Sequence, residues 1–370
     1  MSQVLDVLVV GGGLSGLLVA RGANEQCLDW KLLEASPILG GRLRNDQRFD
    51  QIDLGGAWIW PKYQARILKL IQRDLHQPLK TFPQPDDPSS TRIVGGAVQI
   101  VHSIVKELDE EKNRITCNSP VVRCRLEKQN GETVVQVISL AASTESSGPS
   151  QNSVANANNQ CFLARTVVFA IPPRLLSVHV KFDPEMSPSK QATVATSQTW
   201  MAGVTKVSLI YKERFWDSYL SSMGLPPGSG PGFQMYDASN VDGSVVAITV
   251  FSLVPADGDA DKDDDLLAKR IAEQISTVWK HLGAGGLSEM VGEYSSYAVQ
   301  RWSKEPYISH DQRPTRIDPH PCPLPELAKP EWDGRLLFAG TETDQEAPGV
   351  MEGAVGAAKR VLNELKTRKR

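Results

Sequence analysis

The chain has 370 residues, of which 40 are Lys or Arg, 43 are Asp or Glu and 41% are hydrophobic. This composition can bury a large core and excludes a disordered or collagen-like chain. The net charge of −3 supplies no broad positive field for nucleic acid or an anionic membrane, so we expect a small or neutral partner. Five scattered cysteines without a CxxC pair indicate a reducing compartment, no disulfide framework and no structural metal.

The N-terminal stretch Val4–Ala20 is apolar enough to be compared with a signal peptide or a membrane span. Asp6 and four glycines interrupt it, no basic residue precedes it, and it is shorter than the roughly 20 residues that cross a bilayer. The C-terminus has a basic tail and no hydrophobic anchor. We therefore expect a soluble cytoplasmic protein without a membrane partner.

The first elements predict a nucleotide-binding unit. Asp6–Val10 is a β-branched run typical of a buried parallel strand, and the helical pattern LLVARGA follows it after a glycine turn. The next apolar run, Trp30–Leu33, leads directly into the acidic residue Glu34. Strand, glycine turn, helix, strand and acid stand in the order that a dinucleotide-binding unit requires.

Three glycines explain the chemistry of this turn, because Gly11, Gly13 and Gly16 fit the pattern GxGxxG. Gly11 permits the tight turn, Gly13 lets the backbone approach a pyrophosphate, and Gly16 lets the helix pack on the strand. The helix N-terminus then faces negative phosphates, and Glu34 can accept hydrogen bonds from both ribose hydroxyls of an adenosine. A glycine-rich turn without a ligand is the alternative.

The middle of the chain is less regular. Its hydrophobic pattern predicts a helix over 64–75, an irregular connector over 79–92, a helix over 98–108, and strands over 121–126 and 133–140 joined at Asn130-Gly131. Residues 141–160 are rich in Ser and Asn and almost uncharged, which is typical of a surface loop.

The second half predicts strands over 166–171, 204–211 and 245–253, a helix over 266–282, a strand over 335–339 and a helix over 351–365. The acidic block Asp257–Asp265 is interpreted as a cap that also solubilises the helix after it. A calcium site is the alternative, but the block lacks the fixed ligand spacing and terminal Glu of a calcium loop.

A second glycine turn favours a flavin over a nicotinamide. Gly40-Gly41-Arg42 follows Glu34 after a short gap, and Arg42 and Arg44 supply guanidinium charge to a pyrophosphate or to the flavin face. The segment after it carries paired glycines that let backbone lie against a planar ring, and its residues are Asp53, Leu54, Gly55, Gly56, Ala57 and Trp58. Each turn alone is ordinary, whereas the two together indicate a flavin site.

With these motifs the sequence resembles the flavin monoamine oxidase family, within the wider group that includes polyamine oxidases and L-amino-acid oxidases. The resemblance follows family order over nearly the whole chain. It rests on VVGGGLSGL, LEASPILGGRLR, DLGGAWIWPKYQARILKL, SPVVRC, VVFAIPP, VTKVSLIYKERFW, QRWSKEPY and LLFAGTETDQEAPGVMEGAV.

The resemblance implies an α/β fold with two domains. One is a Rossmann-like FAD-binding domain of the glutathione reductase type, and the other is a substrate domain built on a mixed sheet. The expected FAD-binding domain comprises residues 1–78, 93–178 and 310–370, and the expected substrate domain comprises residues 79–92 and 179–309.

The same resemblance assigns residues to the cofactor. Family positions that hold adenosine and pyrophosphate match Gly11, Gly13, Gly16, Glu34, Arg42 and Val121, the last through its backbone. Positions on the flavin side match Gly340, Thr341, Glu342, Val350 and Met351. Glu342 is expected to hold a ribityl hydroxyl. The backbone N–H of Met351, at a helix N-terminus, is expected to face the flavin pyrimidine carbonyl and stabilise the anionic reduced flavin.

Lys206 is the predicted catalytic residue. In the alternating strand VTKVSLIY, Val204, Lys206 and Ser208 share one face, although a lysine in a strand is by itself usually only solvated. The resemblance matches Lys206 to the family lysine that is bonded through water to flavin N5. Desolvation there would lower the pKa of the amine and let it place dioxygen or a proton near the flavin.

Three departures from the family concern the substrate side. No cysteine stands shortly after the EPY motif, where residues 308–312 read ISHDQ, so FAD is expected to bind non-covalently. Gln312 and Val350 stand where the family has two cage tyrosines, and Leu79–Arg92 replaces a long helical insertion that roofs the substrate. The flavin is then open to solvent, or covered by another subunit or a large substrate. The remaining candidate walls, for which core packing is the alternative, are Trp58, Trp60, Trp302 and Tyr307.

The main hypothesis is an FAD-dependent amine oxidase that takes a hydride from the carbon next to nitrogen to flavin N5, with dioxygen reduced to hydrogen peroxide. No general base is obvious, and a lone loop histidine such as His310 is more often only a surface residue. A flavin dehydrogenase, desaturase or isomerase for a larger biosynthetic or hydrophobic substrate is one alternative. A degenerate flavin-binding protein that works through a partner is the other. The sequence leaves the substrate and the oligomeric state open.

Overall fold

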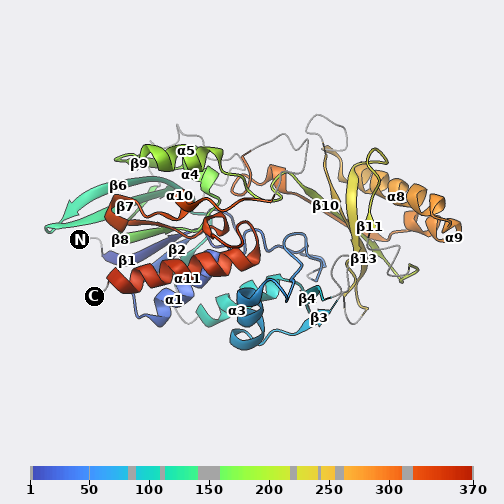
Figure 1. Cartoon of the computed structure of the whole chain (residues 1–370), viewed down its shortest axis with the longest axis horizontal. Coiled ribbons are helices and arrows are strands. Elements are labelled where there is room, and N and C mark those ends of the chain that lie inside the picture. Colours follow the sequence, from blue (N-terminus) through green and yellow to red (C-terminus); the bar gives the residue numbers. More distant parts are fainter. Residues whose placement is uncertain are drawn as a thin grey trace.

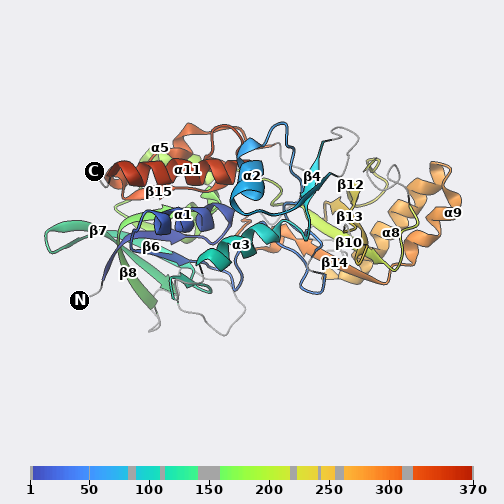
Figure 2. The same ribbon diagram turned by 90° about the horizontal axis from the view of Figure 1, so that it is seen from below.

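The computed structural model describes residues 3–49, 51–81, 89–108, 113–140, 159–216, 223–240, 243–254, 262–310 and 320–368. These residues form two bodies arranged along the long axis, one around an eight-stranded sheet and one around a five-stranded sheet (Figure 1). A two-stranded sheet, β3–β4, lies between them (Figure 2). Both chain ends lie at the end of the first body that is farthest from the second.

The larger sheet has the order β5-β2-β1-β8-β7-β6-β9, and β15 also pairs with β8. Its strands are β1 (Val4–Val10), β2 (Trp30–Leu33), β5 (Ile115–Thr116), β6 (Val121–Gln129), β7 (Glu132–Leu140), β8 (Asn159–Phe169), β9 (Lys181–Asp183) and β15 (Leu336–Phe338). The pairs that join β5, β2, β1, β8 and β15 are parallel, whereas β7 is antiparallel to both β6 and β8. The parallel part contains the predicted nucleotide-binding unit, and β2 has the predicted bounds.

Helices cover both faces of this sheet, as its burial pattern requires. Val7 and Val9 of β1 pack into one core with α1 (Leu14–Glu25), α3 (Val98–Leu108) and α11 (Met351–Arg368). Leu8 and Val10 alternate with them and pack into a second core with α4 (Pro173–His179), α5 (Pro188–Thr196) and α10 (Pro325–Ala328). Figure 1 shows these two groups of helices on opposite sides of the sheet.

The smaller sheet is antiparallel throughout, with the order β11-β12-β13-β10-β14. Its strands are β10 (Thr205–Tyr211), β11 (Met223–Gly224), β12 (Gly232–Asp237), β13 (Val246–Ser252) and β14 (Ser296–Arg301). One face packs on α8 (Asp264–His281), near the short helix α9 (Gly285–Ser288). The predicted acidic cap is confirmed at Asp263, whose side chain accepts the backbone N–H of Leu266.

The other face of this sheet points back to the first body. Val207 and Leu209 of β10 face α8, whereas Ile210 packs with Ile52 and Leu54 from the segment after the second glycine turn. Because side chains alternate along a strand, Lys206 lies on the same inward face as Ile210. This alternation of side chains along β10 places Lys206 at the junction between the two bodies.

Two connecting segments differ from their sequence predictions. The predicted helix over 64–75 consists of α2 (Ala65–Lys69) and a π-helical turn, η1 (Leu70–Asp74). The predicted irregular connector over 79–92 is wrong at its two ends, which pair as β3 (Leu79–Thr81) and β4 (Thr91–Ile93). β4 is buried, so its backbone groups need partners, and β3 provides them.

Other predictions in loops have different outcomes. The turn at Asn130-Gly131 is confirmed, since both residues have positive φ, 52° and 84°, as a tight hairpin requires. Of the predicted loop over 141–160, residues 141–158 lie outside the described residues, and the last two residues begin β8. Short 3₁₀ turns occur at Met290–Gly292, Trp302–Lys304, Trp332–Gly334 and Thr341–Thr343.

The sheets divide the chain differently from the predicted domain boundaries. β9 pairs with β6 of the larger sheet, and α5 packs in the core of that sheet, although both follow residue 178. We propose that the chain passes from the first body to the second after α5, between residues 197 and 204. None of the helices in the described ranges is long and apolar enough to cross a membrane.

Candidate functional site

A cavity of about 790 Å³ lies between the two bodies. The first body lines it with both glycine turns, the segment before β6 and the turn after β15. The second body contributes side chains of β10, β12 and β13, among them Lys206. The volume falls in the range of about 300–1,000 Å³ that is usual for ligand and cofactor pockets.

The first glycine turn presents an open helix N-terminus to this cavity. Gly13 is the N-cap of α1 and has no side chain with which to cap the helix, so the first N–H groups of α1 are available to a ligand. A Cβ on Gly13 would meet nothing nearer than the carbonyl oxygen of Gly40, at 4.0 Å. A Cβ on Gly16 would instead lie 1.9 Å from the carbonyl oxygen of Gly11. Gly16 therefore serves helix packing and, unlike the other two glycines, does not line the cavity.

Glu34 lies at the end of β2 and is held in a fixed orientation. Its Oε2 accepts the N–H of Gly12 at 2.6 Å, and its Oε1 accepts the N–H and the hydroxyl of Ser36, both at 2.8 Å. These donors fix the position of the carboxylate, which lines the cavity together with Val121. The arrangement is compatible with the predicted acceptance of ribose hydroxyls.

Tyr307 lies near the Glu34 end of the cavity, away from the predicted substrate side. Its ring packs edge-on against His179 at 6.3 Å, and burial followed by the nearby Glu34 carboxylate raises the pKa of its phenol. The sequence could not locate it, because the EPY motif continues from β14 in the second body and crosses back to the first.

Arg42, in the cavity wall, forms an ion pair of 2.8 Å with the buried Glu342 behind it. Among the described residues, Nη1 of Arg42 has no hydrogen-bond partner, and the ion pair is the only polar contact of the Glu342 carboxylate. Arg42 lines the cavity with Gly340 and Thr341, whereas Glu342 does not. Buried charged groups with free hydrogen-bonding capacity are expected where a polar ligand completes the site.

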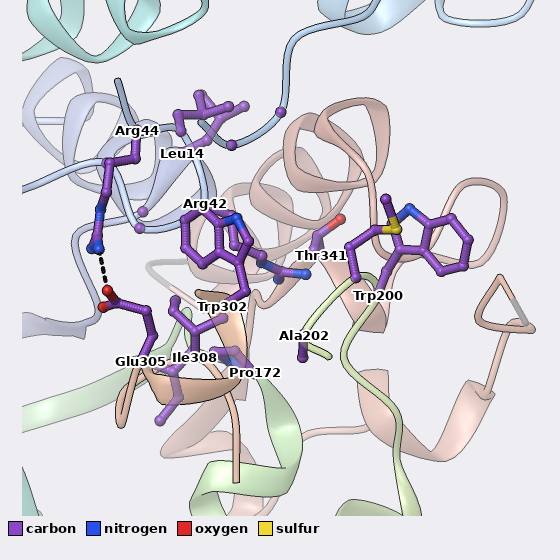
Figure 3. A pocket seen from close by; sticks show the side chains of 18 of the residues that line it. Leu14, Arg42, Arg44, Pro172, Trp200, Ala202, Trp302, Glu305, Ile308 and Thr341 are labelled. Atoms are coloured by element: carbon purple, nitrogen blue, oxygen red, sulfur yellow. Dashed lines mark ion pairs between the residues drawn. The ribbon is translucent and has the colours of Figure 1, made fainter. Parts of the chain in front are cut away.

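Arg44 links the two bodies across the cavity. Its Nη1 lies 2.7 Å from Oε1 of Glu305, and its guanidinium lies over the Trp302 ring, 5.3 Å from the ring centroid. The Trp302 indole N–H donates to the carbonyl of Leu54 at 2.9 Å. Figure 3 shows the Arg44–Glu305 pair beside Trp302. The Arg44 guanidinium therefore interacts with Glu305 and Trp302, whereas the sequence interpretation assigned it to the pyrophosphate or the flavin face.

Lys206 is buried at the inner end of the cavity. Its Nζ donates to the carbonyls of Gly55 at 2.6 Å and Asp53 at 3.3 Å, and to the hydroxyl of Tyr236 at 3.3 Å. Burial lowers the pKa of the amine to about 8, and Arg92 acts in the same direction whereas Asp53 opposes it. The sequence singled out Lys206 and the Gly55-Gly56 pair, and the structure brings them into contact.

Three residues near Lys206, namely Asp53, Arg92 and Tyr236, were missed as functional by sequence reasoning. Asp53 is buried and accepts the N–H of Ala97 at 2.7 Å, and burial raises the pKa of its carboxyl to about 6. Arg92 lies over the rings of Trp58 and Tyr236, with ring centroids at 5.2 and 5.8 Å. These residues come from three separate segments, so no local motif could have revealed the cluster.

The last helix begins at the cavity with Val350 and Met351, both of which line it. Arg66 of α2 holds this region in place, because its guanidinium donates to Asp344 and Glu352 at 2.9–3.1 Å. Glu352 in turn accepts the N–H of Ile67 at 2.8 Å. The clamp joins the start of α11 to α2, and no local sequence pattern indicates it.

Most of the predicted site residues line the cavity. They are Gly11, Gly13, Glu34, Arg42, Gly55, Gly56, Ala57, Trp58, Trp60, Val121, Lys206, Trp302, Tyr307, Gly340, Thr341, Val350 and Met351. Gly16 and Glu342 lie behind its wall, and His310 does not line it. Gln312 lies outside the described residues.

Comparison with known proteins agrees with this geometry. The profile described as flavin containing amine oxidoreductase matches residues 87–364, and that of an NAD(P)-binding Rossmann-like domain matches residues 9–73. The chain belongs to the flavin-containing amine oxidoreductase family. A flavin-containing amine oxidase of Danio rerio is 25% identical, with 98% of this chain and 86% of the relative covered.

Two solved structures in this family of folds cover 100% of both chains. They are cyclohexylamine oxidase from Brevibacterium oxydans, with a TM-score of 0.72, and putrescine oxidase bound to putrescine, with a TM-score of 0.71; each is 15% identical. At this identity they establish the fold. The predicted α/β architecture with a Rossmann-like domain and a sheet-rich second domain is thereby confirmed.

Family membership makes the chain an FAD-dependent oxidoreductase of the amine oxidase type. The cofactor prediction is confirmed, and the residues around the cavity fit FAD: an uncapped helix end, a buried ion pair with spare hydrogen-bonding capacity and a glycine pair beside Lys206. None of the five cysteines is among the described residues that line the cavity, which agrees with non-covalent binding. The Danio rerio alignment spans 466 positions against 370 residues here, in line with a shortened chain.

Proposed function

We propose that this chain is an amine oxidase that binds FAD non-covalently in the cavity between its two bodies and uses dioxygen as the electron acceptor. The observation that carries the proposal is the hydrogen bond from Lys206 Nζ to the Gly55 carbonyl. It places a desolvated amine beside Gly55 and Gly56, whose backbone can lie against the planar flavin ring because they have no side chains. The named relatives are all amine oxidases, which favours this activity over a dehydrogenase or an isomerase.

The first body would hold the adenosine and the pyrophosphate. The N–H groups at the start of α1 would bind phosphate oxygens, Glu34 would accept the ribose hydroxyls, and Arg42 would offset the phosphate charge. Its unpartnered Nη1 is the donor available for this task. The buried Glu342 would accept a hydroxyl of the ribityl chain.

The second body would complete the flavin end. Bound FAD supplies the hydride acceptor for the carbon next to the amine nitrogen and the route by which electrons reach dioxygen. Lys206 holds or releases a proton at Nζ in this dry region, and the start of α11 at Met351 presents a positive helix end. Trp58 and Trp302 exclude water from the cavity wall.

The proposed substrate is an amine that enters with its nitrogen uncharged, since among the described lining residues the carboxylates of Glu34 and Glu305 already have partners. Hydride loss from a neutral amine needs no strong general base. The product imine is then hydrolysed by water to a carbonyl compound and an amine or ammonia. Oxygen is reduced to hydrogen peroxide with the two electrons that the amine has lost.

Two measurements test this proposal. The visible spectrum of the purified protein, followed by acid precipitation, should release FAD into the supernatant, whereas colour in the pellet would refute non-covalent binding. A panel of primary and secondary amines should then yield hydrogen peroxide in step with oxygen consumption. Rapid flavin reduction without oxygen consumption would instead identify a dehydrogenase, and a flavin that no amine reduces would identify a degenerate site.

A further inference from the structure

Three charged side chains from separate parts of the chain meet beneath the Lys206 end of the cavity. Lys206 comes from β10, Arg92 from β4 and Asp53 from the segment after the second glycine turn. All three are at least 94% buried. The Asp53 carboxylate therefore acts on both cations in a region that is largely shielded from water.

Within the part of the chain that the structure describes, no carboxylate forms an ion pair with the ammonium of Lys206. Its three hydrogen bonds go to two backbone carbonyls and one phenol, and the rings of Phe251 and Tyr236 lie 4.8 and 5.5 Å from it. The Asp53 carboxylate accepts the Ala97 N–H instead. Neutral acceptors stabilise a buried cation far less than an ion pair does.

Arg92 is anchored where it acts on the other two groups through space. Its guanidinium lies against the faces of Trp58 and Tyr236, and its Nη2 donates to the Ser239 carbonyl at 3.2 Å. Arginine keeps its proton under all ordinary conditions, whereas a buried lysine gives its proton up readily. When one carboxylate must serve both cations, the lysine is the group that loses its charge.

We propose that Arg92 is a positioning residue that competes with Lys206 for the field of the Asp53 carboxylate and so makes Lys206 the proton-exchanging group of this cluster. The inference rests on the proposed function only in assigning Lys206 to the flavin. The arrangement of charges stands without that assignment.

The directions of the individual pKa shifts agree with this arrangement. Burial is the main cause that lowers the pKa of Lys206 to about 8, with Asp53 raising it and Arg92 lowering it further. Burial also raises the pKa of Asp53 to about 6, against the Ala97 hydrogen bond and the two cations. From β12, Tyr236 faces the cluster with a phenol whose pKa burial raises, and Asp237 acts on Arg92. Phe251 of β13 and Gln300 of β14, the strand partners of Lys206, carry no charge.

The test is a pH titration of Lys206 in the full-length, FAD-containing protein labelled with ¹³C at the lysine ε-carbons. The Lys206 signal is identified by its loss in Lys206→Met. Arg92→Gln should raise the titration midpoint by about one pH unit, because Asp53 is then left to Lys206 alone. Asp53→Asn should lower the midpoint by about as much. Shifts of opposite sign are the signature, since a purely structural disturbance would not produce them.

An unchanged midpoint in Arg92→Gln, or shifts of the same sign in both variants, would overturn the proposal. Arg92→Lys, which keeps the charge, should leave the midpoint near that of the native protein, as should the remote control Arg165→Gln. If a single variant does not fold, the double variant Arg92→Gln/Asp53→Asn replaces it. That variant removes one charge of each sign, and a midpoint far from the native one would contradict the charge-sharing account.

Failure of the proposed function has a different signature. If Lys206→Met re-oxidises with dioxygen at the native rate while the midpoints shift as expected, the flavin role of Lys206 is wrong and the charge inference holds. If the midpoints do not move while Lys206→Met re-oxidises slowly, the flavin role holds and the inference about Arg92 is wrong.

Discussion

The two ends of the cavity are built in different ways. At the Glu34 end the polar groups that face the cavity are mostly backbone, namely the N–H groups at the start of α1 and the glycine turns around them. At the Lys206 end the cavity meets the amine of Lys206, and behind it the charged side chains of Arg92 and Asp53 are buried among aromatic rings. The first arrangement depends on the absence of side chains, and the second on their exact neighbours.

This difference has consequences for what each end tolerates. A backbone site has a fixed geometry and N–H donors that do not titrate, so these donors respond to an added Cβ rather than to pH. A site of buried charges tolerates changes in size better than changes in charge, because low dielectric surroundings make every unpaired charge costly. Four predictions test the contrast, beginning with the largest effect.

Gly16→Ala should break the Glu34 end. The new Cβ would lie 1.9 Å from the Gly11 carbonyl oxygen, and neither backbone can move without separating α1 from β1. We expect a loss of about 3 kcal/mol or more in unfolding free energy, together with loss of bound FAD. Denaturant unfolding and flavin absorbance measure the two. Gly286→Ala is the matched control, since nothing lies within 4 Å of its added Cβ; equal behaviour of the two variants would refute the packing role.

Lys206→Met should change reactivity without breaking the fold. Re-oxidation of the reduced protein by dioxygen should slow about tenfold or more, because the charge or proton at Nζ is lost. Unfolding free energy at neutral pH should stay level or rise, since an apolar chain replaces a desolvated ammonium. Stopped-flow absorbance gives the rate. The exposed Lys212→Met serves as the control, and an unaltered rate in Lys206→Met would remove Lys206 from the mechanism.

Asp53→Asn should remove a pH-dependent part of the stability. Burial raises the pKa of Asp53 from 3.8 to about 6, so the folded protein holds this proton more tightly than the unfolded chain does. The stabilisation is therefore fully present below pH 3.8 and is lost as pH rises through about 6. The native protein should lose about 2–3 kcal/mol relative to the variant over this range. Parallel pH profiles of unfolding free energy for the two proteins would contradict the assignment.

Glu305→Gln should have the smallest effect. It weakens only the ion pair between Glu305 and Arg44, which links the two bodies across the cavity. The side chains of Arg44 and Glu305 are 14% and 27% exposed, so the change in unfolding free energy should stay below about 1 kcal/mol. The rate at which FAD dissociates should rise a few-fold, as the two bodies separate more easily. Glu25→Gln, in an exposed pair on α1, controls for charge removal. Equal FAD dissociation rates would show that the pair does not hold the cavity closed.

The same contrast explains what the sequence could predict. Local patterns gave β2 and α3 with their observed bounds and located the glycine turns, since strand, turn and helix chemistry act over a few residues. Lys206 was found through alternation in β10 and through the family resemblance. These signals all belong to contiguous segments.

What the sequence could not provide depends on contacts between distant segments. The pairing of β3 with β4 and of β9 with β6 is decided by the tertiary core. The connector was therefore predicted wrongly, and the domain boundary that we propose after α5 differs from the one that the sequence predicts. Arg92 stands in a proline-rich stretch that gave no reason to expect a buried charge. Its role becomes visible only when Asp53 and Tyr236 lie beside it.

The clamp made by Arg66 has a consequence for biosynthesis. The cavity takes its phosphate-facing turn from the first residues of the chain and Val350 and Met351 from the start of its last helix, and α11 packs on α1. A nascent chain on the ribosome therefore lacks one wall of the cavity until α11 has been synthesised. Cofactor loading then follows the synthesis of α11, and deletion of this helix should yield colourless protein even though every glycine of the first turn is present.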